Sequence, residues 1–313
     1  MRNKKLLFSS LAGLFVLVMI NSCGKTAEKP VKASGEDAFH LTDTAHAVWE
    51  NPKITEFKAF IAQLDSSDIT TVTKATEKYK AIFTGQPALL CDSAFVVFQA
   101  LYDSVEIHLS FKHQSDTTNY EPLLYEDQAA VPKALKDYRK NLTSNGFKLS
   151  ASEGVTYIEQ DRNFIAKNFY NLVSPVMKDY LSEIQLENRQ GFAMDGTITI
   201  SPRLLVDRNV WYEKFIAVNP GFVFISNCKD YKKAYLTYLL CGYEKTSVYS
   251  NRQTGDLSDF YVNAYNYLLS KYADSQTTKN ISPYYDALKQ KQAAEAQSIL
   301  KDYQIKGMIY SLK

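Results

Sequence analysis

The chain has 313 residues, of which 45% are apolar and 22% charged, a balance typical of folded globular proteins and not of disordered ones. Only 12 residues are glycine, whereas 22 are tyrosine, and so few glycines argue against the glycine-rich loops of nucleotide-binding α/β enzymes. The net charge of +2 falls to −1 for residues 23–313, because three basic residues lie before them, so nothing indicates nucleic-acid binding.

The first 22 residues have the pattern of an export signal. The basic start MRNKK is followed by a 15-residue, mostly apolar run, LLFSSLAGLFVLVMI. This run is shorter than the roughly 20 residues of a membrane-spanning helix, but it suits the apolar region of a secretory signal. We therefore predict that residues 1–22 are a signal peptide. A retained membrane helix and plain secretion are the alternatives.

The residues that follow this run resemble the lipobox of bacterial lipoproteins: Ile20-Asn21-Ser22-Cys23 has an aliphatic residue at −3, a small residue at −1 and then the cysteine. The resemblance implies that a diacylglycerol is joined to the Cys23 thiol, that cleavage falls before Cys23, and that the new amine can also be acylated. Two or three acyl chains hold a protein firmly on a bilayer. Gly24, where an aspartate would retain the protein at the inner membrane, implies an outer-membrane protein that faces the periplasm.

Residues 23–50 read as a flexible tether, because GKTAEKPVKASGEDAFH is polar, contains Gly, Pro and Ser, and lacks helical periodicity. Beyond it, apolar residues recur at helical spacing. We predict a mainly α fold, an irregular or repeat-like array of helical hairpins. The expected division is a helical region at 51–145 and another at 146–313, and the two can also form one continuous domain.

Start and stop signals mark several helices in this body. Asn51-Pro52 places a capping side chain before a proline at the first helical position, and three Ser-Pro pairs do the same. These pairs are Ser174-Pro175, Ser201-Pro202 and Ser282-Pro283. Gly146 follows the apolar stripe of residues 135–142 and can end that helix.

Two short stretches interrupt the helical pattern. FKLSASEGVTYIEQD begins at residue 147 and predicts a small β-hairpin near 147–158, with a loop as the alternative. TITI at 197–200 reads as a short strand or an extended lead-in to the next helix.

Residues 211–231 align with residues 265–285 at an offset of 54. The aligned pairs are Trp211 with Tyr265, Phe215 with Leu269, Val218 with Tyr272 and Tyr231 with Tyr285. Each segment ends one helix, turns, and begins another. Over about residues 200–290 this resembles the helical hairpins of tetratricopeptide-type proteins, although the offset differs from their ~34-residue period. The resemblance implies a scaffold for protein partners, and an irregular bundle is the alternative.

No catalytic motif for nucleotide, serine-hydrolase or zinc-protease chemistry occurs, so we predict no catalytic residues, no metal and no cofactor. His108 and His113 are five residues apart, a poor spacing for sharing one helical face. Paired carboxylates such as Glu159 and Asp161, with Glu153 nearby, could hydrolyse a glycoside. Such pairs more often cap a helix or face water.

Three cysteines remain after Cys23, namely Cys91, Cys228 and Cys241. If one helix carries Cys228 and Cys241, their 13-residue separation holds them about 20 Å apart, beyond the reach of a disulfide. We predict that the thiols are buried and act as small apolar groups.

Aromatic residues flank the polar segment 246–258. Exposed rings can stack on sugars or contact a protein, whereas rings at helical spacing fill a core. The candidate binding residues are Tyr243, Tyr249, Phe260, Tyr261 and Tyr265. We expect a lipid-anchored, non-enzymatic module of the cell envelope for protein partners. A glycan-binding lipoprotein for nutrient capture and an envelope hydrolase with an unrecognised site are the alternatives.

Overall fold

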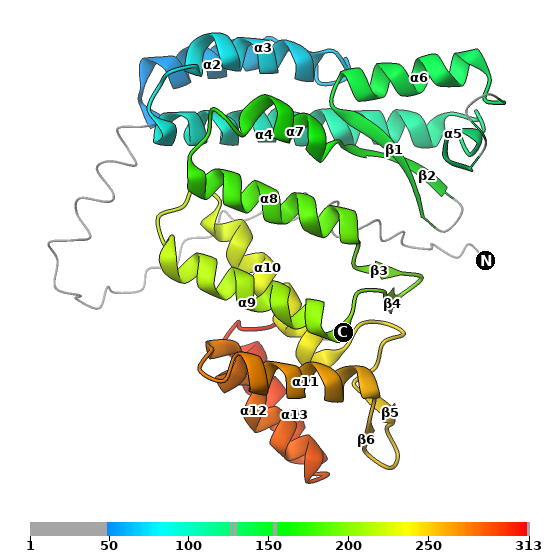
Figure 1. Ribbon diagram of the computed structural model, residues 1–313, viewed down its shortest axis with the longest axis vertical. Helices are drawn as coiled ribbons and strands as arrows, with labels where there is room; N and C mark the ends of the chain where they lie inside the picture. The colour runs from blue at the N-terminus through cyan, green and yellow to red at the C-terminus, as the bar shows by residue number, and fades with distance from the viewer. Residues whose placement is uncertain (1–48, 126, 128–129, 153–154, 312–313) are drawn as a thin grey trace, which may run out of the picture. The chain divides into compact units, whose positions relative to one another are not determined.

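The structure is a computed structural model that describes residues 49–313, apart from 126, 128–129, 153–154 and 312–313 (Figure 1). The predicted signal peptide, Cys23 and almost all of the predicted tether therefore lie outside the described residues, as does Glu153. Twelve helices and three two-stranded sheets make up the described part. The prediction of a mainly α fold with a small hairpin is thus confirmed.

The chain forms two compact units, and the boundary along the chain lies between Arg189 and Gln190. The sequence suggested a division after residue 145 instead. The reason for the difference is the hairpin of β1 (Phe147–Ser152) and β2 (Val155–Gln160), which packs on α4 (Ala88–Ser115) and α6 (Lys133–Ser144). The hairpin therefore completes the core of the first unit.

The first unit is built around α4, against which α2, α3 and β2 pack. Its other helices are α2 (Pro52–Ile61), α3 (Thr71–Phe83), α5 (Pro122–Tyr125), α7 (Arg162–Phe169) and α8 (Pro175–Gln190). By length and composition alone α4 could cross a membrane, but more than half of its most apolar window is buried inside the protein. Such burial is typical of the central helix of a globular unit.

Aromatic rings fill the core of the first unit. Phe169 of α7 lies at its centre, with ring centroids 4.5 Å from Phe98 and 4.9 Å from Tyr79. The buried Tyr79 hydroxyl donates a hydrogen bond of 2.8 Å to the backbone carbonyl of Cys91. Tyrosine thus packs like phenylalanine and also ties α3 to α4.

The β1–β2 hairpin is antiparallel, with Phe147 opposite Gln160 and Ser152 opposite Val155. Gly146 connects it to α6 with a φ of +89°, a conformation that glycine adopts easily. The glycine thus ends α6, as the sequence predicted. The Tyr102 hydroxyl of α4 donates a hydrogen bond to the Gly146 carbonyl.

The second unit consists of helical pairs and two small sheets. Its helices are α9 (Pro202–Val218), α10 (Ile225–Cys241), α11 (Asp259–Lys271), α12 (Gln276–Lys289) and α13 (Ala293–Ile305). Its strands are β3 (Ala193–Met194), β4 (Thr197–Ile198), β5 (Tyr249–Asn251) and β6 (Asp256–Leu257). Helix α9 packs on both α10 and α11. The short strand expected at 197–200 is β4.

The predicted turns of the aligned segments fall between helices. Asn219-Pro220 separates α9 from α10, and Ala273-Asp274 separates α11 from α12. The buried Tyr265 hydroxyl donates a 2.6 Å hydrogen bond to the Leu239 carbonyl and so joins α11 to α10. The likeness to tetratricopeptide hairpins remains a prediction.

Three of the four proposed Pro-containing helix starts are confirmed. Asn51 accepts a hydrogen bond from the Lys53 amide at 3.0 Å, and α8 and α9 begin at Pro175 and Pro202. In both, the preceding serine hydroxyl accepts a hydrogen bond from a first-turn amide, at 3.1 and 3.2 Å.

The fourth proposed start, Ser282-Pro283, is wrong because Pro283 lies inside α12. That helix begins seven residues earlier, at Gln276, where the Ser275 hydroxyl accepts a hydrogen bond from the Thr278 amide at 3.0 Å. Ile281 and Tyr284 on either side of the pair are buried. The packing of these side chains stabilises the helix despite the proline.

Candidate functional site

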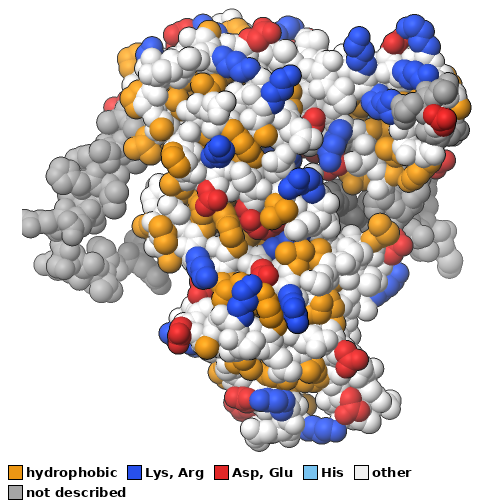
Figure 2. All heavy atoms as spheres, viewed as in Figure 1, with side chains coloured by type: hydrophobic (Ala, Val, Ile, Leu, Met, Phe, Trp, Pro, Cys, Tyr) orange, Lys and Arg blue, Asp and Glu red, His pale blue; other side chains and the backbone are white. Residues whose placement is uncertain are grey.

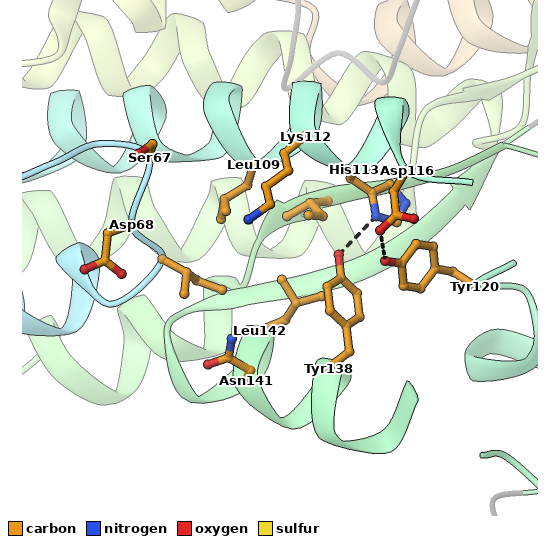
Figure 3. Close-up of a pocket in the computed structure, with 12 residues that line it drawn as sticks. Ser67, Asp68, Leu109, Lys112, His113, Asp116, Tyr120, Tyr138, Asn141 and Leu142 are labelled. Atoms are coloured by element: carbon orange, nitrogen blue, oxygen red, sulfur yellow. Dashed lines mark hydrogen bonds between the residues drawn. The ribbon is translucent and has the colours of Figure 1, made fainter. Parts of the chain in front are cut away.

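A cavity of about 370 Å³ lies in the first unit between α4, α6 and the loop that joins α2 to α3 (Figure 3). We call it the α4–α6 cavity. Its lining comprises Ser67, Asp68, Ile69, Leu109, Lys112, His113, Asp116, Tyr120, Tyr138, Asn141, Leu142 and Ile158. Its volume falls within the range of small-molecule sites.

One face of α4 supplies a third of this lining. Lys112 and His113 lie three and four residues after Leu109, and Asp116 at the helix end lies three residues after His113, so all four project to the same side. Leu109 is buried together with Leu142 of α6 and Ile158 of β2. These three side chains give the cavity an apolar floor.

Three rings that pack against one another at a tilt form one wall. The Tyr120 ring centroid lies 4.5 Å from that of His113 and 4.7 Å from that of Tyr138. His113 Nδ1 is hydrogen-bonded to the Tyr138 hydroxyl at 3.0 Å, and Nε2 to the Thr156 hydroxyl at 2.9 Å. Both imidazole nitrogens are therefore engaged within the protein.

Burial lowers the pKa of His113, with the nearby Asp116 carboxylate acting in the opposite direction. A lowered pKa favours a neutral imidazole at neutral pH. Because both of its nitrogens are also hydrogen-bonded, His113 orients the tyrosine wall and is poorly placed to act as a general base.

Two ionised carboxylates lie at opposite ends of the cavity (Figure 3). Hydrogen bonds from the Thr70 hydroxyl and amide lower the pKa of Asp68 to about 2. Hydrogen bonds from the hydroxyls of Thr118 and Tyr120 lower the pKa of Asp116 to about 2. Both side chains are acceptors at neutral pH.

Hydrogen-bond donors lie between these carboxylates. Lys112 and Asn141 are exposed side chains of α4 and α6, and their ammonium and amide groups can donate to a ligand. The cavity thus offers an apolar floor, an aromatic wall, two anionic acceptors and two donors.

A second group of carboxylates lies on the hairpin side of α4, outside the cavity lining. The pKa of Glu106 is raised to about 7, chiefly by burial; the charge of Arg162 lowers it, and the charges of Asp103 and Glu159 add to the rise. Asp103 is held by the side-chain amides of Gln99 and Gln160, each at 2.7 Å.

The other acidic and histidine candidates have local structural roles. Asp161 caps α7 by accepting a hydrogen bond from the Asn163 amide at 2.9 Å. His108 is exposed, with Nδ1 2.8 Å from the Ser104 carbonyl of the same helix. Within the described ranges, no three His, Cys, Asp or Glu side chains gather in a way that could hold a metal ion.

The five aromatic candidates of the second unit do not form one exposed surface. Tyr261 and Tyr265 are 0% exposed, and the Tyr261 hydroxyl donates to the Tyr238 carbonyl at 3.0 Å. These two residues therefore fill the core, which the sequence analysis gave as the alternative to a binding role. The remaining three, Tyr243, Tyr249 and Phe260, are half-buried.

The half-buried rings belong to different packing groups. Tyr243 packs edge-on against Phe192, at 5.5 Å between centroids, whereas Phe260 packs against Tyr261 at 5.1 Å. Burial raises the pKa of Tyr249. The polar segment between them contains the β5–β6 hairpin.

All three cysteines in the described part are free thiols. Cys91 and Cys228 are buried as predicted, and Cys241 is half-buried. Cys228 and Cys241 lie on the single helix α10, and burial raises the pKa of each to about 12. Protonated thiols are weak nucleophiles.

No protein family matches this chain, and no curated protein or solved structure is similar to it. Function must therefore be inferred from the sites themselves.

Proposed function

We propose that this protein is a lipid-anchored protein of the bacterial cell envelope that captures a neutral glycan in the α4–α6 cavity. The lipobox-like Ile20-Asn21-Ser22-Cys23 supports the anchor and the compartment. The composition of the cavity supports the ligand class, and it carries the proposal.

A sugar ring matches each part of this lining. Its C–H face packs on apolar and aromatic surface, here supplied by Tyr138 and the floor. Its hydroxyls donate to ionised carboxylates such as Asp68 and Asp116, and they accept from Lys112. The lining carries two negative charges and one positive, and Lys74, paired with Asp68 at 3.0 Å, balances the second carboxylate, which matches an uncharged sugar.

Hydrolysis is less well supported than binding. A glycosidase needs one protonated carboxyl group as its general acid, but the pKa values of Asp68 and Asp116 are both about 2. Glu106, with a pKa of about 7, does not line the cavity.

The sequence favours a protein partner over a glycan, whereas the composition of the α4–α6 cavity supports the glycan. A large contiguous apolar patch is one mark of a protein interface. Of the large exposed apolar side chains, Leu89 and Phe111 lie on the same helix but 22 residues apart, or about 33 Å along its axis. In Figure 2, hydrophobic side chains lie among charged ones.

A glycan array with the full chain, purified in detergent, tests the proposal. We expect a neutral glycan signal that weakens about tenfold or more in Asp116→Asn and Tyr138→Ala, because each removes a direct contact. Tyr125→Ala is the matched control, since this exposed tyrosine of α5 does not line the cavity.

Two results would overturn this assignment. One is a glycan signal that both cavity variants retain in full. The other is release of new reducing ends from the bound glycan by the wild-type chain, which would make it a hydrolase. If the melting temperatures of the variants equal that of the wild type, a weaker glycan signal reflects a lost contact and not a loss of folding.

A further inference from the structure

The second unit has a groove of its own, with a volume of about 600 Å³. We call it the α9–α11 groove. Its lining comprises Ser201, Pro202, Arg203, Asn263, Asn266, Tyr267 and Ser270. The first three begin α9, and the other four lie at three- and four-residue steps on one face of α11.

The groove is lined by hydrogen-bond donors and contains no acidic side chain. Arg203 is exposed, with its guanidinium 5.4 Å from the centre of the Tyr267 ring. In the described part of the chain, none of the ion pairs involves Arg203. Its charge is therefore available to a ligand.

The acid closest to this arrangement is already engaged. Asp207, one turn after Arg203 on α9, accepts a hydrogen bond from the Tyr267 hydroxyl at 3.0 Å and pairs with Lys271 at 3.3 Å. The Tyr272 hydroxyl also donates to Asp207 at 2.7 Å. This network fixes the Tyr267 ring on which the guanidinium rests.

Neighbouring side chains are oriented as donors too. The buried Tyr285 donates its hydroxyl hydrogen to Asn266 Oδ1 at 3.1 Å, which leaves the two N–H groups of that amide for the groove. The Ser201 oxygen accepts from the Leu204 amide at 3.2 Å, so its own O–H can donate outward.

We infer that the α9–α11 groove binds a sugar that carries one carboxylate, of the uronic acid class. A guanidinium grips a carboxylate through two parallel hydrogen bonds. One unpaired arginine matches one negative charge. The amide and hydroxyl side chains from Asn263 to Ser270 extend the site by about 10 Å along α11, which suits the hydroxyls of a sugar ring.

This site is independent of the α4–α6 cavity and of the neutral glycan proposed there. The two linings differ in charge, because the cavity contains Asp68 and Asp116 whereas the groove contains Arg203 and no acid. Because the cavity is proposed to bind neutral sugars, the groove is tested in the full chain carrying Tyr138→Ala, in which the cavity has lost an aromatic contact.

Calorimetry with the full chain in detergent provides the test. The probe is aldobiouronic acid, a disaccharide of one glucuronate and one neutral sugar, and its methyl ester is the uncharged match. We expect the acid to bind at least tenfold more tightly than the ester. Arg203→Met should abolish that difference, and Arg203→Lys should leave part of it, because lysine keeps the charge but loses the fork.

Arg252→Met is the control, since it removes the same charge from an exposed position of the same unit outside the groove. The proposal is overturned if Arg203→Met binds the acid like the wild type, if the ester binds as tightly as the acid, or if inorganic phosphate binds as tightly as the disaccharide. Asp116→Asn should leave acid binding unchanged, so failure of the cavity proposal would not count against the groove.

Discussion

Single residues of this protein combine a local backbone task with a packing task, and Gly146 shows both. Its φ is +89°, and a Cβ placed there would lie 3.0 Å from the Phe164 ring and from the Tyr102 hydroxyl. Gly85 has a φ of +75° but open space around it. A substitution at Gly85 therefore introduces backbone strain alone, whereas a substitution at Gly146 introduces backbone strain and steric crowding.

We expect Gly146→Ala to lower the free energy of unfolding by about 2–4 kcal/mol, the sum of left-handed backbone strain and overpacking. Gly85→Ala, the matched control, should cost only about 1 kcal/mol. Urea denaturation measures both. Equal losses in the two variants would show that the Phe164 ring moves aside freely.

Glu106 is the residue from which a pH dependence follows. Its folded-state pKa of about 7 lies above its ordinary value of 4.5. Between these values the folded chain keeps a proton that the unfolded chain has lost, so stability falls as the pH rises through this window. Asp103 on α4, Glu159 on β2 and Arg162 on α7 are the charges that act on it.

Glu106→Gln removes the titrating group. We expect this variant to be more stable than the wild type at pH 8, by about 2 kcal/mol, and to lose less stability between pH 5 and pH 8. Thermal unfolding at both pH values provides the measurement. Glu77→Gln, an exposed change on α3, is the control and should show the same dependence of stability on pH as the wild type. If Glu106→Gln also showed the wild-type dependence, burial would not disfavour the charge of Glu106.

At the scale of the element, helix ends are decided by competition between caps and packing. Pro283 lies within α12, where a proline removes one backbone hydrogen bond and strains the preceding turn. Its side chain is exposed, so little packing is lost when it is replaced. The proline persists in the helix because Ile281 and Tyr284 on either side are buried.

Pro283→Ala should therefore stabilise the protein by about 1–2 kcal/mol, since alanine restores an amide and favours the helix, against a smaller gain of freedom in the unfolded chain. Pro202→Ala, at the first position of α9, should change the stability little because no helical hydrogen bond is missing there. Melting temperatures of the two variants decide the matter. A lower melting temperature for Pro283→Ala would contradict the expected gain.

The sequence predicted elements better than it predicted the site. Polar caps beside prolines and long apolar stripes act within a few residues, so α2, α4, α6 and α9 could be read directly. Helix α3 was missed because buried threonines such as Thr71 and Thr76 weaken its apolar stripe. The sequence does not distinguish buried tyrosines such as Tyr261 from exposed binding residues, since a hydroxyl that reaches a backbone carbonyl leaves no local signal.

The α4–α6 cavity could be foreseen only in part. Leu109, Lys112, His113 and Asp116 already share a helical face in the sequence, but nothing local indicates that Asp68 and Ile158 meet them. Contacts between segments more than 40 residues apart depend on the packing of the whole unit. The same dependence explains the boundary at Arg189, since a hairpin is assigned to a unit by what it packs against.

At the scale of the whole molecule, the lipobox resemblance gives the main prediction. Cells fed a palmitate analogue should label the wild-type chain and not Cys23→Ala, while Cys241→Ala keeps the label as a matched control. Cleavage before Cys23 also removes three positive charges and changes the net charge from +2 to −1. Isoelectric focusing should therefore place the mature chain below the precursor pI of about 8.1.

Retained label in Cys23→Ala would refute the anchor. A mature band that focuses with the precursor would show that the leader is not removed. Neither result would bear on the two proposed sugar sites, because the residues that line them all lie after residue 50.

The ultraviolet absorbance of the tyrosines whose hydroxyls donate to backbone carbonyls can be used to follow unfolding of this protein. A phenol changes its ultraviolet absorption when it loses its proton, but burial raises the pKa of Tyr79 and Tyr265 far above that of an exposed tyrosine. These rings stay spectroscopically silent in base until the helices they join come apart. A sweep to high pH should thus show a first wave of absorbance from exposed rings and a second, abrupt one at the moment of unfolding.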